Sequence, residues 1–333
     1  MVAGMAFAGP LAPLFARPPI VLAPMEDVSD LPFRRLCREL GADVTMTEFV
    51  RAERLLGRCR AAARKVTLAP DDRPTAIQIY GADAGLLMEA AEVAAAAGPA
   101  FVDVNCGCWV PRVARGGAGA AWLRRPDAMV EMAARVVARV APLPVTVKTR
   151  IGWGDEAEMP IVDLARGLED AGVAAITVHC RTASMGHRGR ADWSWAARVQ
   201  RVVRIPVVVN GDIRSADDAR RALDETGAAG VMIGRAAIDG PWIFREVQAL
   251  LTRGERLPPC SLDERLRLYA RVLADNVAQR GPRFGVEVTR RHARAWFAPF
   301  AGGEALRARL MRASSESECR AIVEQQRGDA DAA

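Results

Sequence analysis

Eight short apolar runs, rich in Val and Ile, alternate with longer amphipathic stretches over residues 1–250, and this alternation constrains the fold more than any other feature of the chain. Most of the runs are nearly free of polar residues, which is typical of parallel strands that are covered on both faces. Eight such strands with intervening helices predict a TIM (β/α)8 barrel. The expected strands are Pro19–Met25, Asp43–Phe49, Ala76–Tyr80, Phe101–Asn105, Val145–Arg150, Ala175–His179, Pro206–Asn210 and Gly230–Ile233.

The stretches between these strands carry helix signals at both ends. Asp30 and Ser215 stand in N-cap positions, and Gly41, Gly172 and Gly227 stand where helices should end. A doubly wound open sheet is the alternative fold. The barrel is favoured because no Gly-x-Gly-x-x-Gly follows the first strand and because polar residues gather at the strand ends. The expected helices are Pro32–Leu40, Ala84–Ala97, Pro126–Val140, Pro160–Ala171, Trp193–Val203 and Ala216–Glu225.

The pattern changes after residue 251. Pro258 and Pro259 mark a linker, and Ser261–Arg280 begins with a capping box in which Glu264 follows the Ser three residues later. Gly285–Phe297 and Gly303–Gln325 also have helical periodicity. We therefore expect a barrel domain over residues 1–250 and a smaller all-helical domain over residues 258–333.

Charge and hydropathy narrow the class of protein. The formal net charge is +6, and residues 251–333 hold fifteen arginines against eleven acidic residues, so the last quarter of the chain carries +4 of that excess. A basic tail favours an acidic partner such as a nucleic acid. Since all but two of the 46 basic residues are arginine, a solvated Arg-rich helix is the alternative. No run of about 18 uncharged apolar residues is present, so no membrane span is expected.

Cysteine and histidine usage indicates a reducing compartment and no resident metal. The seven cysteines are odd in number and scattered, and they contain no Cys-x-x-Cys pair. A cytoplasmic protein without a disulfide framework is expected. The three histidines are too few and too dispersed for an obvious metal site.

Polar residues recur where the expected strands end, and in a barrel those ends form the active-site mouth. Asn210-Gly211-Asp212 and Gly234-Arg235 follow the seventh and eighth strands, where barrels often bind phosphate through backbone amides and a helix N-terminus. Two tight turns with a solvated arginine are the alternative. The other strand-end residues are Ala23, Pro24, Met25, Glu48, Gln78, Asn105, Cys106, Cys108, Lys148, Arg150, His179 and Arg181.

Two of these residues suggest chemistry. Lys148 lies among β-branched residues, where an unpaired charge is costly to bury. It is either part of an ion pair at the rim or a cation for an anionic cofactor. Cys108 lies on a glycine-containing loop, where a thiol can act as a nucleophile or a proton donor. A buried, inert thiol is the alternative.

Six motifs in this order resemble those of the tRNA-dihydrouridine synthases. A further run, Gly-Pro-Trp-Ile-Phe-Arg-Glu at 240–246, is most similar to the bacterial B subfamily. The six motifs are Ala-Pro-Met at 23–25, Asn-x-Gly-Cys at 105–108, Val-Lys-Thr-Arg at 147–150, Val-His-x-Arg-Thr at 178–182, Asn-Gly-Asp-Ile at 210–213 and Met-Ile-Gly-Arg-Ala at 232–236.

The resemblance implies an FMN-bearing barrel followed by a helical tRNA-binding domain. We also expect a monomer without metal. It implies that NADPH reduces the flavin, that the flavin gives hydride to C6 of a uridine, and that Cys108 gives a proton to C5. Asn105 and Arg181 would contact the substrate, and Arg290, Arg291 and Arg294 would contact tRNA phosphates, with His292 and Trp296 in the same stretch. The implied FMN contacts are Ala23, Pro24, Met25, Gln78, Lys148, His179, Asn210, Gly211, Asp212, Gly234 and Arg235.

The chain departs from the family pattern beside the cysteine. Trp109 stands where the family usually has proline, and Cys106 creates a Cys-x-Cys arrangement, so Cys106 is the alternative donor. His187 stands where related sequences often carry an aromatic residue, and it is expected near the substrate. Two other functions stay open: an FMN-barrel oxidoreductase for a small pyrimidine-like substrate, and a catalytically altered RNA-binding homologue.

Overall fold

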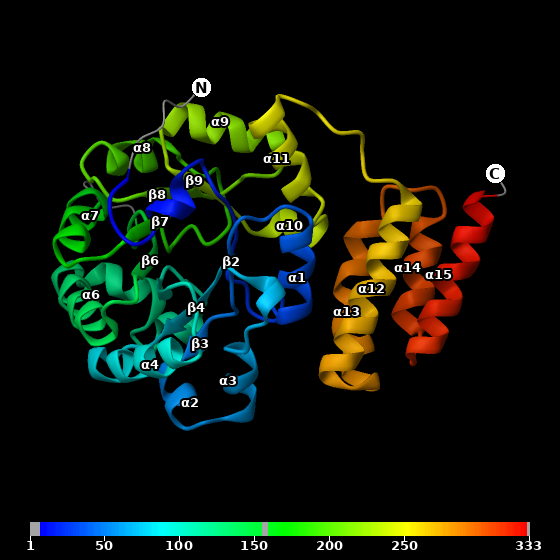
Figure 1. The fold of residues 1–333 in the computed structure, drawn as a ribbon, viewed down its shortest axis with the longest axis horizontal. Coiled ribbons are helices and arrows are strands. Elements are labelled where there is room, and N and C mark those ends of the chain that lie inside the picture. The colour runs from blue at the N-terminus through cyan, green and yellow to red at the C-terminus, as the bar shows by residue number, and fades with distance from the viewer. Residues whose placement is uncertain (1–6, 155–158, 332–333) are drawn as a thin grey trace.

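The computed structural model describes residues 7–154 and 159–331 and contains a closed ring of parallel strands wrapped by helices (Figure 1). The strands are ordered β1-β9-β8-β7-β6-β5-β4-β2, and a parallel bridge between Val21 and Val44 joins the two ends. The TIM barrel is therefore confirmed. The strands are β1 (Ile20–Leu22), β2 (Thr45–Met46), β3 (Val50–Arg51), β4 (Thr75–Tyr80), β5 (Val102–Cys106), β6 (Val145–Arg150), β7 (Ala175–His179), β8 (Val207–Asn210) and β9 (Gly230–Ile233).

The second predicted strand is interrupted. Asp43–Phe49 was expected to be continuous, but β2 and β3 are separated by residues 47–49. Thr45 pairs with Thr75, and Val50 pairs with Ile79. The chain therefore advances five residues on this strand while β4 advances four. The extra residue is a bulge, which ends regular pairing and redirects side chains at the barrel rim.

The helices that cover the barrel begin and end largely where the sequence indicates. Asp30 and Ser215 cap their helices by accepting from the amides of Phe33 and Asp218, and Gly227 ends a helix at φ +63°. The short helices α2, α3, α5 and α10 lie in connections where no helix was expected. The helices are α1 (Leu31–Glu39), α2 (Ala52–Leu56), α3 (Arg60–Lys65), α4 (Ala84–Ala96), α5 (Pro111–Ala114), α6 (Pro126–Val140), α7 (Ile161–Asp170), α8 (Ser194–Gln200), α9 (Ala216–Thr226), α10 (Arg235–Asp239) and α11 (Ile243–Arg253), with 3-10 turns at Ala12–Phe15, Pro70–Asp72 and Gly119–Arg124.

The tail consists of helices that stand side by side next to the barrel (Figure 1): α12 (Leu262–Arg280), α13 (Pro282–Phe297), α14 (Gly303–Arg312) and α15 (Glu316–Asp331). The prediction of one helix over Gly303–Gln325 is wrong. Ala313 has extended backbone (ψ 131°), and the Ser315 hydroxyl caps the next helix by accepting from the Glu318 amide. No helix within the described ranges is both long and apolar enough to cross a membrane.

The tail is fastened to the barrel by aromatic packing and a buried carboxylate. Trp296 is fully buried and donates its indole N–H to the carbonyl of Ile238 (2.9 Å). His292 stacks on Phe33 of α1, with ring centroids 5.1 Å apart. Asp30, which caps α1, also accepts from Arg280 and Arg291 of the tail (2.8 and 3.0 Å).

Candidate active site

A cavity of about 940 Å³ opens at the carboxyl ends of the strands. Its walls come from distant parts of the sequence because the ends of parallel strands meet at one mouth. The strand register places Asn105 beside Lys148 and His179 beside Asn210. Of the predicted site residues, those lining the cavity are Ala23, Pro24, Met25, Asn105, Cys108, Lys148, His179, Asn210, Gly211, Asp212, Gly234 and Arg235.

One end of the cavity offers hydrogen-bond donors. Gly211 has φ +115°, and a Cβ there would lie 2.9 Å from the Cβ of Ala191, so only glycine fits. Within the described part of the chain, no hydrogen bond uses the backbone amides of Gly211, Asp212, Gly234 or Arg235. Unused amides beside an arginine suit an anion such as a phosphate.

The centre of the cavity is electropositive. Lys148 donates to Asn210 Oδ1 (3.1 Å), and it forms no salt bridge with any described residue. Burial, and then the charge of Arg150, lower the pKa of Lys148 to about 8. Burial also lowers the pKa of His179 well below its usual value, and its Nδ1 is buried without a partner. His179 is therefore neutral at pH 7, and the region would be stabilised by a bound anionic group.

Cys108 faces this region from a tightly held loop. Asn105 Oδ1 accepts from the amides of Gly107 and Cys108 (3.1 and 2.9 Å), and the Cys108 carbonyl accepts from the Ala120 amide (3.0 Å). Burial raises the pKa of the Cys108 thiol, so the group is protonated at neutral pH and suits proton donation. Cys106 is fully buried and does not line the cavity, which removes it as the alternative donor.

Arg150 connects two loops at the mouth. Its guanidinium donates to the carbonyl of Gly107 (2.9 Å) on the cysteine loop, and to those of Thr182 and Gly186 (both 2.8 Å) on the loop after β7. Trp109 packs on Gly186, where a Cβ would lie 3.1 Å from the indole ring. The sequence pattern placed Arg150 at a strand end but gave no indication of this bridging role.

Aromatic rings form the adjoining wall. Trp109 meets His187 edge to face, with centroids 5.6 Å apart, and His187 lies 6.3 Å from His179. All three line the cavity. Trp109 therefore lines the same cavity as Cys108 and packs against the neighbouring loop.

Four predicted site residues have other partners. Gln78 is fully buried and hydrogen bonded to Asp103 and Asn105, and the fully buried Arg181 side chain is paired with Asp212 (2.5 Å). Arg290 donates to the Ala313 carbonyl (2.7 Å), and Arg291 to Asp30. None of the four lines the cavity.

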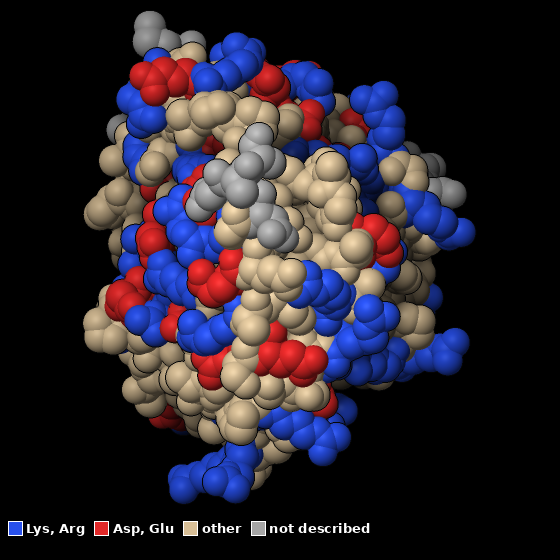
Figure 2. All heavy atoms as spheres, turned by 90° about the vertical axis from the view of Figure 1, so that its right-hand side faces the viewer, with Lys and Arg blue, Asp and Glu red and all other residues tan. Residues whose placement is uncertain are grey.

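Among the predicted tRNA contacts on α13, Arg294 is exposed and has no partner among the described residues. His292 and Trp296 are fully buried, so neither can contact RNA in this structure. Figure 2 shows the face of the molecule that the tail forms, where basic side chains cover more of the surface than acidic ones and the two are interspersed on part of it. Several tail arginines are paired with carboxylates on the same helix, including Arg267, Arg283, Arg307 and Arg320.

The cavity continues between the barrel and the tail, which sequence reasoning missed. Trp242 and Glu246 of the barrel and Arg265 and Pro299 of the tail line this part. The Arg265 guanidinium lies over the Trp242 ring, 4.3 Å from its centroid. The contact joins residues 23 positions apart across the linker, and no local pattern reveals it.

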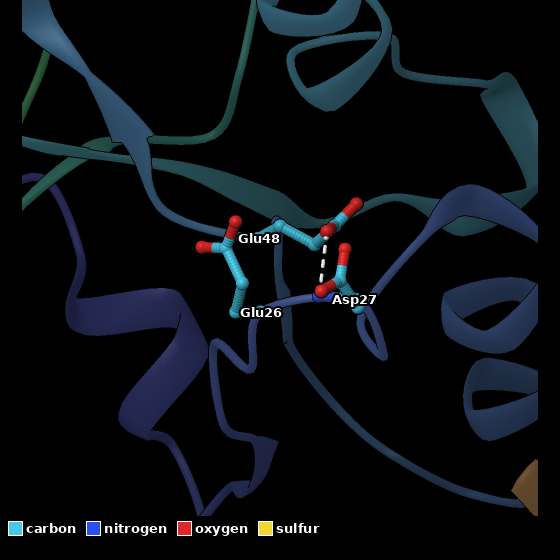
Figure 3. A group of neighbouring side chains, drawn as sticks. All are labelled: Glu26, Asp27 and Glu48. Carbon is cyan, nitrogen blue, oxygen red and sulfur yellow. Dashed lines mark hydrogen bonds between the residues drawn. The ribbon is translucent and has the colours of Figure 1, made fainter. Parts of the chain in front are cut away.

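Three carboxylates gather beside the mouth. One carboxylate oxygen each from Glu26, Asp27 and Glu48 lie within 4.8 Å of one another, and Glu48 accepts from the Asp27 amide (Figure 3). Lys65 pairs with Glu26 and lies 3.5 Å from Glu48. An internal cation therefore already neutralises part of this cluster.

Comparison with known proteins identifies similar chains. Residues 21–330 match the family model described as dihydrouridine synthase. The chain is 38% identical over 291 residues to tRNA-dihydrouridine synthase B of Pseudomonas putida, covering 87% of this chain and 86% of that protein. It is 36% identical over 278 residues to tRNA-dihydrouridine synthase B of Escherichia coli, covering 84% and 86%.

Solved structures share the barrel. Morphinone reductase superposes with a TM-score of 0.53 at 13% identity, over 74% of this chain and 88% of that chain. A 2-naphthoyl-CoA reductase superposes with a TM-score of 0.55 at 12% identity, over 69% and 49%. At these identities the likeness establishes the fold alone.

Proposed function

Because this chain belongs to the dihydrouridine synthase family, we propose that it is a tRNA-dihydrouridine synthase. It is an FMN-dependent oxidoreductase that reduces the C5–C6 bond of specific uridines in tRNA to 5,6-dihydrouridine. The observation that carries the proposal is a protonated thiol, Cys108, in the same cavity as an electropositive pocket lined by Lys148 and His179.

The residues present fit FMN. The unused amides of Gly211, Asp212, Gly234 and Arg235 suit the phosphate. Lys148 is a partly buried cation without a salt bridge among the described residues, and an anionic reduced ring would stabilise its charge. His179 and Asn210 flank that position on neighbouring strands. Ala23, Pro24 and Met25, which directly follow β1, add an apolar wall.

The protein's own residues then set up proton transfer. When bound, the reduced flavin supplies the hydride that adds to C6 of the uracil. Asn105 and Arg150 hold the loop so that Cys108 faces the cavity. The Cys108 S–H bond breaks, its proton adds to C5, and a thiolate remains, which solvent reprotonates before the next turnover. Positioned acid catalysis of this kind contributes about 10²–10⁴ in rate.

A uridine must leave its base stack to reach this depth, which favours an extruded base in a flexible loop of the RNA. The part of the cavity lined by Trp242, Glu246, Arg265 and Pro299 gives such a nucleotide a path between barrel and tail. Arg294 is exposed on α13 and suits a phosphate contact. We assign NADPH as the reductant and the cytoplasm as the compartment.

The test is mass spectrometry of tRNA from a strain that lacks this gene. A particular uridine should lose the two additional hydrogens of dihydrouridine. The wild-type gene should restore them, and C108A should not. Restoration by C108A would contradict the assigned acid, whereas unchanged tRNA in the deletion strain would contradict the tRNA substrate. Reduction of a free pyrimidine without RNA would favour a small-molecule oxidoreductase instead.

A further inference from the structure

A continuous chain of hydrogen bonds runs from a buried carboxylate to the loop that carries Cys108. Asn105 Oδ1 accepts from the backbone amides of Gly107 and Cys108 (3.1 and 2.9 Å). Asn105 Nδ2 donates to Gln78 Oε1 (2.8 Å). Gln78 Nε2 donates in turn to Asp103 Oδ2 (2.6 Å), two residues before Asn105 on β5.

The shape of the side chains does not fix the direction, from donor to acceptor, in which these hydrogen bonds run. The side-chain amides of Gln78 and Asn105 can each be flipped without a change in volume, and a flipped amide presents donors where acceptors are needed. A flipped Asn105 would aim its NH2 group at two backbone N–H groups and release the loop. Asp103 and Gln78 are fully buried, so water cannot replace a partner that either of them loses.

We propose that Asp103 is a positioning residue for the catalytic thiol. By presenting an acceptor to Gln78, it fixes the direction of the hydrogen bonds that pass through Asn105 to the Cys108 loop. The catalytic role of that thiol rests on the proposed function, but the loop geometry can be measured without turnover.

Two other roles for Asp103 predict different behaviour. The first is a counter-ion role toward Lys148 on β6, whose charge acts to lower the pKa of Asp103; Thr146 of the same strand, which pairs with Asp103, donates to Asp103 Oδ1 (2.5 Å). The second is simple filling of space inside the barrel. Burial raises the pKa of Asp103 to about 7, against the opposing effects of Thr146, Gln78 and Lys148. Both its ionised and its protonated forms offer an acceptor to Gln78.

Three isosteric variants separate these roles. D103N removes the charge but keeps an amide oxygen toward Gln78, while the Thr146 hydroxyl turns to accept from the new amide. Q78E places two acceptors face to face, which breaks the bond between residues 78 and 103 and leaves the side chain that Asn105 binds without its anchor. In D103N/Q78E the introduced amide donates to the introduced carboxylate, which again accepts from Asn105. If Asp103 fixes the direction of the hydrogen bonds, only Q78E should expose Cys108. If Asp103 acts through its charge, D103N should expose Cys108. If Asp103 only fills space, none of the three variants should do so.

The measurement is alkylation of the flavin-loaded protein by iodoacetamide, followed by mass spectrometry of the Cys108 peptide. Cys59 is exposed and lies outside the cavity, so its peptide serves as an internal reference. Losing two loop hydrogen bonds of about 1 kcal/mol each should raise Cys108 alkylation on the order of tenfold or more. Dihydrouridine formation should fall by a similar factor in Q78E, and flavin content should stay unchanged in D103N.

The expected pattern is protection of Cys108 in wild type, D103N and D103N/Q78E, with exposure in Q78E. The Q78E defect should lessen as pH falls, because one proton shared by the two carboxylates restores a donor between them. Increased alkylation of Cys108 in D103N, or wild-type protection of Cys108 in Q78E at alkaline pH, would overturn the proposal. If Q78E does not fold, D103N and D103N/Q78E carry the test, and loss of protection in either overturns it. Absence of dihydrouridine in the wild type refutes the proposed function without changing these readings.

Discussion

Replacing Lys148 by methionine should make the flavin-free protein more stable while it weakens flavin binding. The side chain is held at the centre of the cavity by one hydrogen bond, to Asn210. Its pKa falls from 10.5 to about 8, chiefly through burial. At about 1.4 kcal/mol per pKa unit, the ammonium costs the folded flavin-free protein about 3 kcal/mol at neutral pH.

K148M removes this cost and loses a hydrogen bond worth about 1 kcal/mol, so the net gain is about 2 kcal/mol. With an unfolding entropy of about 2.1 cal/mol/K per residue, a chain of 333 residues should gain about 3 °C in Tm. The direction in which stability changes with pH follows from the lowered pKa of Lys148 in the folded protein. The cost is fully present below pH 8 and is relieved as pH rises from 8 to 10.5, so the difference between wild type and K148M should close over that range.

The assay is thermal unfolding of both proteins after flavin removal, with flavin affinity measured by fluorescence titration. The chain's other lysine supplies a matched control. Lys65 pairs with Glu26 and lies close to Glu48, so K65M should lower stability and leave flavin affinity unchanged. For K148M, flavin affinity should fall at least about tenfold. A lower Tm in flavin-free K148M, or wild-type affinity for FMN, would refute the assignment of Lys148 as a cation that the cofactor stabilises.

Three further predictions follow from the site and the tail. C108A should lower dihydrouridine formation by about 10²-fold or more while NADPH still bleaches the flavin at the wild-type rate, and slow bleaching in stopped-flow absorbance would argue against a role confined to proton donation. Asp212 has a pKa lowered to about 2 because hydrogen bonding and charge from Arg181 outweigh the raising effect of burial. Its stabilisation is present above pH 3.8 and is lost as pH falls toward 2. D212N should cost about 1.5–3 kcal/mol at pH 7, because Arg181 loses its carboxylate partner and keeps only the carbonyls of Arg188 and Gly189, and a urea midpoint equal to that of wild type would contradict this. R294A should reduce the salt dependence of tRNA binding by about 0.7–0.9 in slope, with R283A, whose arginine is paired with Glu287, as the control that should change it less; equal slopes for R294A and wild type in a filter assay would remove Arg294 from the interface.

The strand pattern was predictable because burial on both faces leaves a direct record in the sequence. Val145–Arg150, Ala175–His179 and Gly230–Ile233 begin and end where the apolar runs do. The break between β2 and β3 was not predictable, because it depends on one extra residue relative to the partner strand. The division of the last helical segment near Ala313 depends on local capping by Ser315, which its helical periodicity concealed.

The candidate site was predictable to the extent that strand ends converge. Position along a strand indicates which residues reach the mouth, but not what a long side chain binds once there. Arg181 satisfied the pattern and is paired with Asp212, and Gln78 lies one layer deeper than expected. A signal for Asp103 was present: Asp103 and Asn105 alternate with Val102 and Val104, so both polar side chains share one face of a buried strand.

The way Trp296 is held has a consequence for how this chain can be shortened. Its indole is bonded to the carbonyl of Ile238 and packs on Trp242, while Arg265 and Pro299 complete the wall opposite the strands. A polypeptide ending at Arg253 would keep Lys148, Arg150 and Arg235 of the pocket but lose Arg265, and it would bare the rings of Phe33 and Trp242 to solvent. Transplanting the barrel into another protein therefore requires a replacement for that apolar cover.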